Sequence, residues 1–106
     1  MNIKLENSPK YTSFKHLHIG KDHLDVIYIG YNLETTKTEY LILKILAEHT
    51  SEPLSSEQIA SLLPIEITNT SVVYHISRIN AKSKRIGNRN LVKNISKKGY
   101  FLNEEM

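Results

Sequence analysis

Eight basic side chains and no acidic one lie between Glu66 and Glu104. The first 66 residues hold six basic and nine acidic side chains, so the net charge of +3 conceals a strongly positive C-terminal part. Positive charge gathered in one segment creates a local field that attracts phosphate groups. The charge pattern therefore predicts a polyanionic ligand. The eight basic residues are Arg78, Lys82, Lys84, Arg85, Arg89, Lys93, Lys97 and Lys98.

The overall composition is that of a small globular domain. At 106 residues the chain can bury a core but is too short for two ordinary domains, so we expect a single domain over residues 1–106. The absence of cysteine excludes disulfides, thiolate metal sites and cysteine nucleophiles. No window is apolar enough to span a membrane, and no apolar secretory segment begins the chain. We therefore expect a cytoplasmic protein without a membrane partner.

The elements that must position the basic residues begin with a small sheet. Two runs of β-prone residues, 14–19 and 24–29, flank a turn signal at residues 20–23. Residues 30–32 offer a second turn, and Leu33 is a candidate last strand residue. These runs predict an antiparallel sheet within residues 11–33.

The pattern then becomes helical, and three helices are predicted within residues 36–85. Thr36 with Glu39, and Ser55 with Gln58, have the spacing of capping boxes, in which two side chains satisfy orphan amides at a helix start. The first helix, at about 37–49, is apolar over so much of its circumference that we expect it to be central. The second ends at about Leu63, before Pro64. The third spans about 69–85 and has three candidate caps: Thr68, Asn69 and Thr70.

The third helix has two different faces. Val72, Ile76, Ile79 and Ser83 recur at the helical period and predict the buried face. After a loop at 87–90, strands at 91–95 and 100–102 predict a hairpin within 91–103 with a cationic tip. The opposite face of the helix carries hydrogen-bonding, aromatic and cationic groups: Thr70, Tyr74, Ser77, Arg78, Ala81 and Lys82.

Three helices followed by a hairpin with lysines at its tip predict a winged helix-turn-helix, an α+β fold. The major groove of B-DNA admits one helix, and the adjacent groove and phosphates suit a basic hairpin. We expect the helix at about 69–85 to enter the major groove and the wing at about 91–102 to lie on the neighbouring groove and backbone. The candidate DNA-binding residues are Asn69, Thr70, Val73, Tyr74, Ser77, Arg78, Lys82, Arg85, Asn94, Ser96, Lys97 and Lys98.

These candidates have different expected roles. Most of the basic residues, including Lys82, Arg85, Lys97 and Lys98, are expected to contact phosphate, which positions the protein without specifying sequence. Arg78 could bind guanine, contact phosphate or form a surface ion pair. Thr70, Val73 or Tyr74 could pack against thymine methyl groups.

The order of motifs resembles the OmpR/PhoB-type winged-helix effector domain of bacterial response regulators, across roughly residues 14–103. The resemblance implies that the third helix enters the major groove and the hairpin reaches the adjacent minor groove. It also implies head-to-tail pairs on direct repeats of double-stranded DNA and a loop before the third helix that often touches RNA polymerase. The matching segments are Leu33 and Thr36 with Glu39, Leu54 to Ile59, Ser71 to Ile79, and Gly99 to Leu102.

The chain also departs from that family pattern. Asn80 replaces a usual arginine and Ser83 a usual leucine, while Ser96 and Lys97 stand where the wing commonly has Arg-Gly. The loop before the third helix is short for the family, which makes polymerase contact a weaker expectation than DNA binding. No receiver domain precedes the domain, so we expect a stand-alone regulator or an excised domain.

Four rival interpretations can be set against DNA binding. His16, His18 and His23 suggest a metal site, but spaced surface histidines lack the tight ligand pattern of zinc, and we expect no metal and no cofactor. No phosphate loop, paired carboxylates or activated nucleophile indicates an enzyme. The main alternative is a winged-helix module that binds an acidic protein or another regulator, and RNA is a lesser alternative. Steep salt dependence would distinguish a nucleic-acid partner from an apolar protein interface.

Overall fold

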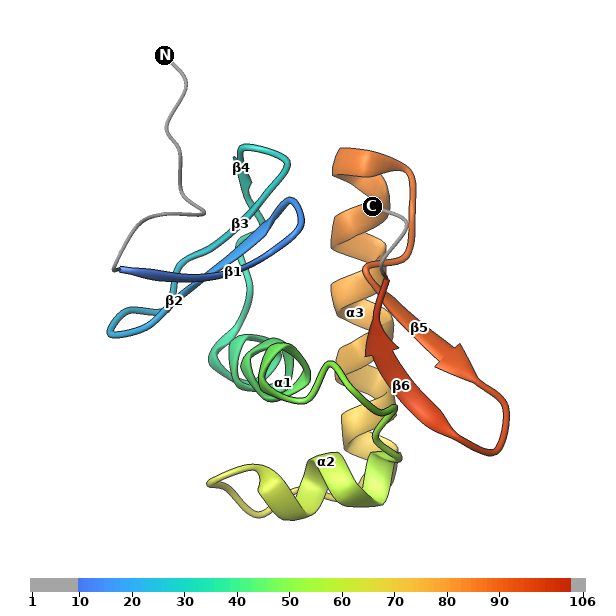
Figure 1. Cartoon of the computed structure of the whole chain (residues 1–106). Coiled ribbons are helices and arrows are strands. Elements are labelled where there is room, and N and C mark those ends of the chain that lie inside the picture. Colours follow the sequence, from blue (N-terminus) through green and yellow to red (C-terminus); the bar gives the residue numbers. More distant parts are fainter. Residues whose placement is uncertain (1–9, 104–106) are drawn as a thin grey trace.

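The computed structural model describes residues 10–103, which form a sheet, three helices and a hairpin (Figure 1). The predicted α+β architecture of a winged helix-turn-helix is confirmed. The strands of the four-stranded antiparallel sheet, in spatial order, are β1 (Tyr11–Phe14), β2 (Leu17–Gly20), β3 (Val26–Tyr28) and β4 (Tyr31–Asn32). The later elements are α1 (Lys37–Glu48), α2 (Ser56–Leu62), α3 (Asn69–Gly87), β5 (Val92–Ile95) and β6 (Gly99–Leu102).

The N-terminal sheet contains one more turn than the sequence pattern predicts. The run 14–19, predicted as one strand, is divided by a turn at Lys15 and His16, where Lys15 has a left-handed φ of 55°. Leu24 lies outside the strands because β3 begins at Val26. The two short runs therefore do not form one strand each, and the predicted antiparallel sheet is built from four strands.

Helix α1 is central, as its apolar circumference predicts. Thr36 Oγ1 accepts from the Glu39 amide at 3.2 Å and Glu39 Oε1 accepts from the Thr36 amide at 3.0 Å, which confirms the capping box. Ile42 has no exposed surface, because the sheet, α2, α3 and β6 all contact this helix. The Tyr40 hydroxyl donates to the Gly20 carbonyl at 2.6 Å and ties α1 to the end of β2.

Helix α2 is connected to the hairpin just before its first turn. The second capping box is confirmed, because Ser55 and Gln58 each accept a hydrogen bond from the other's backbone amide. Leu54 exchanges two backbone hydrogen bonds with Tyr100 of β6, at 2.9 and 2.7 Å. Gly99 allows this approach, since a Cβ there would lie 2.4 Å from the Leu54 carbonyl. The wing is thereby joined to the helix-turn-helix by backbone pairing.

Helix α3 extends two residues beyond the predicted end at Arg85. Thr68 is its N-cap, one of the three predicted candidates, and Asn88 ends it in the left-handed conformation with φ of 57°. The last turn passes close to the sheet. A Cβ at Gly87 would lie 2.9 Å from the Tyr28 hydroxyl, so this position requires glycine for close packing.

Candidate nucleic-acid interface

One face of α3 is buried and the other is open to solvent. Val72, Ile76, Ile79 and Ser83 form the buried face, as predicted from their spacing. The exposed residues of the helix include several of the predicted DNA-binding candidates. These are Asn69, Thr70, Val73, Tyr74, Ser77, Arg78 and Arg85.

The first residues of α3 present uncharged groups at the exposed surface. Val73 is 43% exposed and Tyr74 57% exposed. The Tyr74 ring meets the His75 ring edge to face, with centroids 5.4 Å apart, which gives the tyrosine a supporting neighbour. Val73 and Ser77 also line an open groove between α3 and the hairpin.

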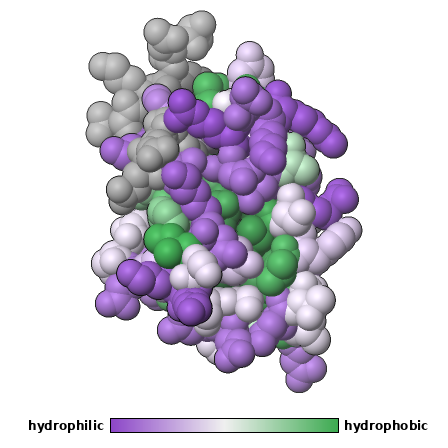
Figure 2. Space-filling model, turned by 90° about the vertical axis from the view of Figure 1, so that its right-hand side faces the viewer, coloured by the Kyte–Doolittle hydropathy of each residue, from purple (hydrophilic) through white to green (hydrophobic). Residues whose placement is uncertain are grey.

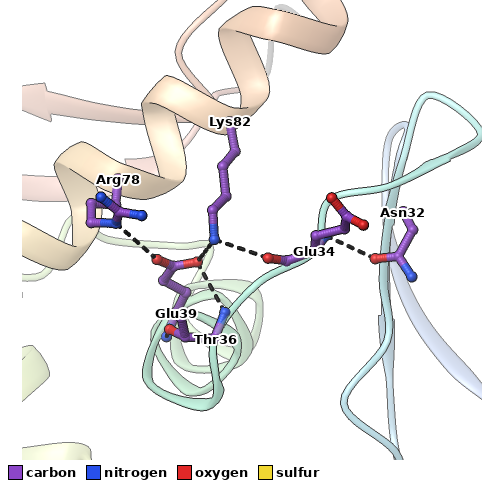
Figure 3. A network of polar contacts seen from close by, with 6 residues as sticks. All are labelled: Asn32, Glu34, Thr36, Glu39, Arg78 and Lys82. Carbon is purple, nitrogen blue, oxygen red and sulfur yellow. Dashed lines mark hydrogen bonds and ion pairs between the residues drawn. The ribbon is translucent and has the colours of Figure 1, made fainter.

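Arg78 and Lys82 lie on the side of α3 that faces the start of α1 (Figure 3). The Lys82 ammonium donates to Glu39 Oε1 at 2.6 Å and to the Glu34 carbonyl at 2.9 Å. Arg78 Nε lies 3.9 Å from Glu39 Oε2. The Glu39 side chain has no exposed surface, so one buried carboxylate faces both cations.

The Glu39 carboxylate partly neutralises the cationic side of α3. Helix α3 contains no acidic residue, but α1 supplies Glu39, which is 43 residues before Lys82 in the sequence. The side chain of Lys82 is only 18% exposed, whereas that of Arg78 is 54% exposed. A phosphate group that approaches Lys82 must therefore compete with an ion pair that is already formed. The role of Lys82 and Arg78 in DNA binding stays a prediction.

The two polar residues that depart from the family pattern in α3 connect this helix to the wing. Asn80 Nδ2 donates to the Val92 carbonyl at 3.0 Å, and its Oδ1 accepts from the Val92 amide at 2.9 Å. The buried Ser83 hydroxyl donates to the Arg89 carbonyl at 2.8 Å and accepts from the Leu91 amide at 3.1 Å. Asn80 and Ser83 thus satisfy backbone groups of the α3–β5 loop and β5, which the sequence alone did not indicate.

The wing presents its candidate residues to solvent. Asn94, Ser96, Lys97 and Lys98 are all exposed, and the tip turns through Lys97, whose φ is 67°. Strands β5 and β6 agree with the predicted hairpin to within one residue at each start. Figure 2 shows the side on which the hairpin projects: hydrophilic residues cover most of it, around a patch of hydrophobic ones near its middle.

The histidines that suggested a metal site are separated by the fold. His16 lies in the turn before β2, whereas His18 belongs to that strand, so the two rings are not on one face of a strand. The His18 ring is buried and bonds to the Ser13 hydroxyl at 2.8 Å, while His23 lies 3.7 Å from Asp25. Within residues 10–103, no three histidine, aspartate or glutamate side chains are grouped to hold a metal. No helix of the same range is long and apolar enough to cross a membrane.

Comparison with known families distinguishes a DNA-binding regulator from the other classes of winged-helix protein considered above. The family model described as "Transcriptional regulatory protein, C terminal" matches residues 30–102, more than half of the chain. The chain belongs to this family. The match runs from the residue before β4 to the last residue of β6 and so covers the helices and the wing. No curated protein sequence matches the chain.

Solved structures with the same fold include the DNA-binding domain of a response regulator. The DNA-binding domain of the response regulator AdeR, solved with an intercistronic region, superposes with a TM-score of 0.75 at 21% identity, covering 86% of this chain and 96% of that one. The Klebsiella pneumoniae RstA DNA-binding domain, solved with the RstA box, gives 0.72 at 23% identity and covers 90% and 98%. The C-terminal effector domain of BfmR from Acinetobacter baumannii gives 0.67 at 29% identity and covers 90% and 91%. The family match and the shared winged-helix fold both agree with the resemblance to OmpR/PhoB-type domains.

Proposed function

We propose that this chain regulates transcription by binding double-stranded DNA at specific sequences, with α3 in the major groove and the β5–β6 wing on the adjacent groove and backbone. The observation that carries the proposal is the family match over residues 30–102. The charge pattern supports it, because residues 67–103 carry eight basic and no acidic side chains. The AdeR and RstA domains, solved with DNA, share the fold.

The proposed contacts divide into two groups by chemistry. The uncharged residues Asn69, Thr70, Val73, Tyr74 and Ser77 face base edges. The basic residues Arg78, Lys82 and Arg85, with the wing residues Asn94, Ser96, Lys97 and Lys98, bind the sugar-phosphate backbone. Since phosphate contacts carry no sequence information, the first group supplies specificity and the second supplies salt-dependent affinity.

We place Arg78 in the backbone group because it lies beyond the first two turns of α3, on the side of the helix that faces the start of α1. The Arg78→Ala variant should therefore lose affinity equally for a specific site and for random duplex. A larger loss on the specific site would instead assign guanine recognition to Arg78.

Two further partners follow from the family resemblance: a second copy of the chain, head to tail on repeated sites, and RNA polymerase. The family match favours DNA over the protein-binding alternative. The proposed setting is the bacterial cytoplasm, where operator DNA is accessible.

The test is a titration of the purified chain against a random duplex pool at several salt concentrations, followed by sequencing of the bound fraction. We expect binding that weakens steeply with salt and an enriched motif. Neutralising Lys97 and Lys98 together should reduce the salt slope by the same amount on all sequences, by about 0.9 log units for each phosphate that the wing no longer neutralises. If the purified chain binds no duplex even at low salt, the proposed function is rejected.

A further inference from the structure

The first two turns of α3, residues 69–76, contain no lysine, arginine or acidic residue. By the 3.6-residue period, the positions of α3 farthest from buried Val72 and Ile76 are Thr70, Tyr74, Arg78 and Ala81, so the exposed face becomes cationic only in the third turn. Val73, at 43% exposure, borders this face on the side of the wing. The first two turns of the proposed reading surface thus present methyl, hydroxyl and aromatic groups.

The groups best suited to guanine are missing from these two turns. The commonest base-specific contact pairs arginine or lysine with guanine O6 and N7. Arg78 follows in the third turn and Lys82 in the fourth, and both lie beside the Glu39 carboxylate of α1: Oε1 binds Lys82 at 2.6 Å and Oε2 lies 3.9 Å from Arg78. Lys84 and Arg85 are in the last turn, whereas helix-turn-helix proteins read base edges with the first turns of the recognition helix.

We infer that α3 reads A·T base pairs, chiefly through thymine methyl groups, so that the operator positions beneath its first turns are A·T-rich. The inference rests on the proposed function and names the sequence class that the same surface accepts. The Thr70 methyl, the Val73 isopropyl group and the Tyr74 ring supply apolar surface to the C5-methyl of thymine. The neighbouring His75 ring, 5.4 Å from that of Tyr74 between centroids, limits the orientations of the tyrosine.

Asn69 adds a second reader of the same base pair. Asn69 is the first residue of α3 and is exposed. The Thr68 hydroxyl caps the helix by accepting from the Ser71 backbone amide, so the side-chain amide of Asn69 is not used as the cap. An asparagine amide can pair with N6 and N7 of adenine in bidentate fashion. Methyl recognition on one strand and amide recognition on the other both select A·T.

The experiment uses the duplex selected from the random pool, with single thymines replaced by uracil, which removes only the methyl group. For the wild-type chain we expect each contacted methyl to contribute about fourfold to affinity, the equivalent of burying one methyl-sized group. Val73→Ala or Thr70→Ser should abolish the uracil effect at one thymine and keep it at the others. Leu24→Ala, which removes an apolar side chain of similar exposure outside the helices, is the matched control and should keep every uracil effect.

Each outcome separates the inference from the proposed function. Selection of an A·T-rich core with uracil effects that disappear in the Val73 or Thr70 variants supports both. Selection of a G·C-rich core, or equal uracil effects in all variants, would overturn the inference while leaving sequence-specific DNA binding intact. Retention of no duplex would overturn the proposed function and the inference with it.

Discussion

The Glu39→Gln substitution tests the buried ion pair between α1 and α3. Glutamine preserves the capping box, because its amide oxygen can still accept from the Thr36 backbone, but it removes the charge that faces Lys82. Removing one partner of a fully buried pair costs about 3–5 kcal/mol. Lys82 keeps the Glu34 carbonyl as a partner at 2.9 Å and retains 18% side-chain exposure. We therefore expect the free energy of unfolding to fall by about 2–3 kcal/mol.

Urea unfolding measures this loss, and Glu34→Gln provides the matched control. Glu34 is exposed, lies in the same network and undergoes the same change of charge, but Lys82 contacts only its backbone carbonyl (Figure 3). Its substitution should change the free energy of unfolding by less than about 0.5 kcal/mol. Adding Lys82→Met to Glu39→Gln should recover part of the stability, because the double variant leaves no unpaired charge.

The same substitution should alter DNA binding in the opposite direction. Without the Glu39 charge, Lys82 binds its phosphate without competition from the carboxylate, and the salt slope should steepen by up to about 0.9 log units, the value for one fully neutralised phosphate. Equal stability losses for Glu39→Gln and Glu34→Gln would refute the energetic reasoning. An unchanged salt slope would show that Lys82 stays outside the DNA interface even when released.

Three further substitutions test contacts elsewhere in the fold. Asn80→Ala should lower the free energy of unfolding by about 2 kcal/mol, because it leaves the Val92 amide and carbonyl unpaired, and urea unfolding with Asn90→Ala as an exposed control would check this. Gly87→Ala should lower the melting temperature, since the added Cβ would lie 2.9 Å from the Tyr28 hydroxyl; a melting temperature unchanged from wild type would contradict the close packing. Burial raises the pKa of Tyr28 above 10.0, partly offset by the positive charge of Arg89, so stability should fall as pH rises above 10. Tyr28→Phe should remove that part of the pH dependence at little cost in stability, because within residues 10–103 the buried hydroxyl has no hydrogen-bond partner.

Features set by neighbouring residues could be predicted from the sequence. Both capping boxes, the central position of α1 and the buried face of α3 follow from spacings of three and four residues, and the structure confirms them. The turn at Lys15 was missed, because neither Lys15 nor His16 is a typical turn residue and only the left-handed φ of Lys15 divides the run. The end of α3 was placed two residues early for a related reason: Asn88, in the left-handed conformation, ends the helix.

Features that join distant residues could not be predicted in this way. The charge pattern placed Lys82 on an acid-free face, but Glu39 reaches it from a helix 43 positions earlier. Asn80 and Ser83 stood out only as departures from the family pattern, whereas in three dimensions they bind Val92 and the backbone before β5. No local periodicity carries information about such partners, because they depend on how the helices and the hairpin pack.

The pairing of Leu54 with Tyr100 has a consequence for how the protein is made. The segment that precedes α2 obtains its backbone partners only from β6, which is 46 residues later in the chain. During synthesis the helices therefore leave the ribosome before the strand that completes their arrangement. The backbone pairing that joins the helix-turn-helix to the wing can therefore form only after β6 has been translated.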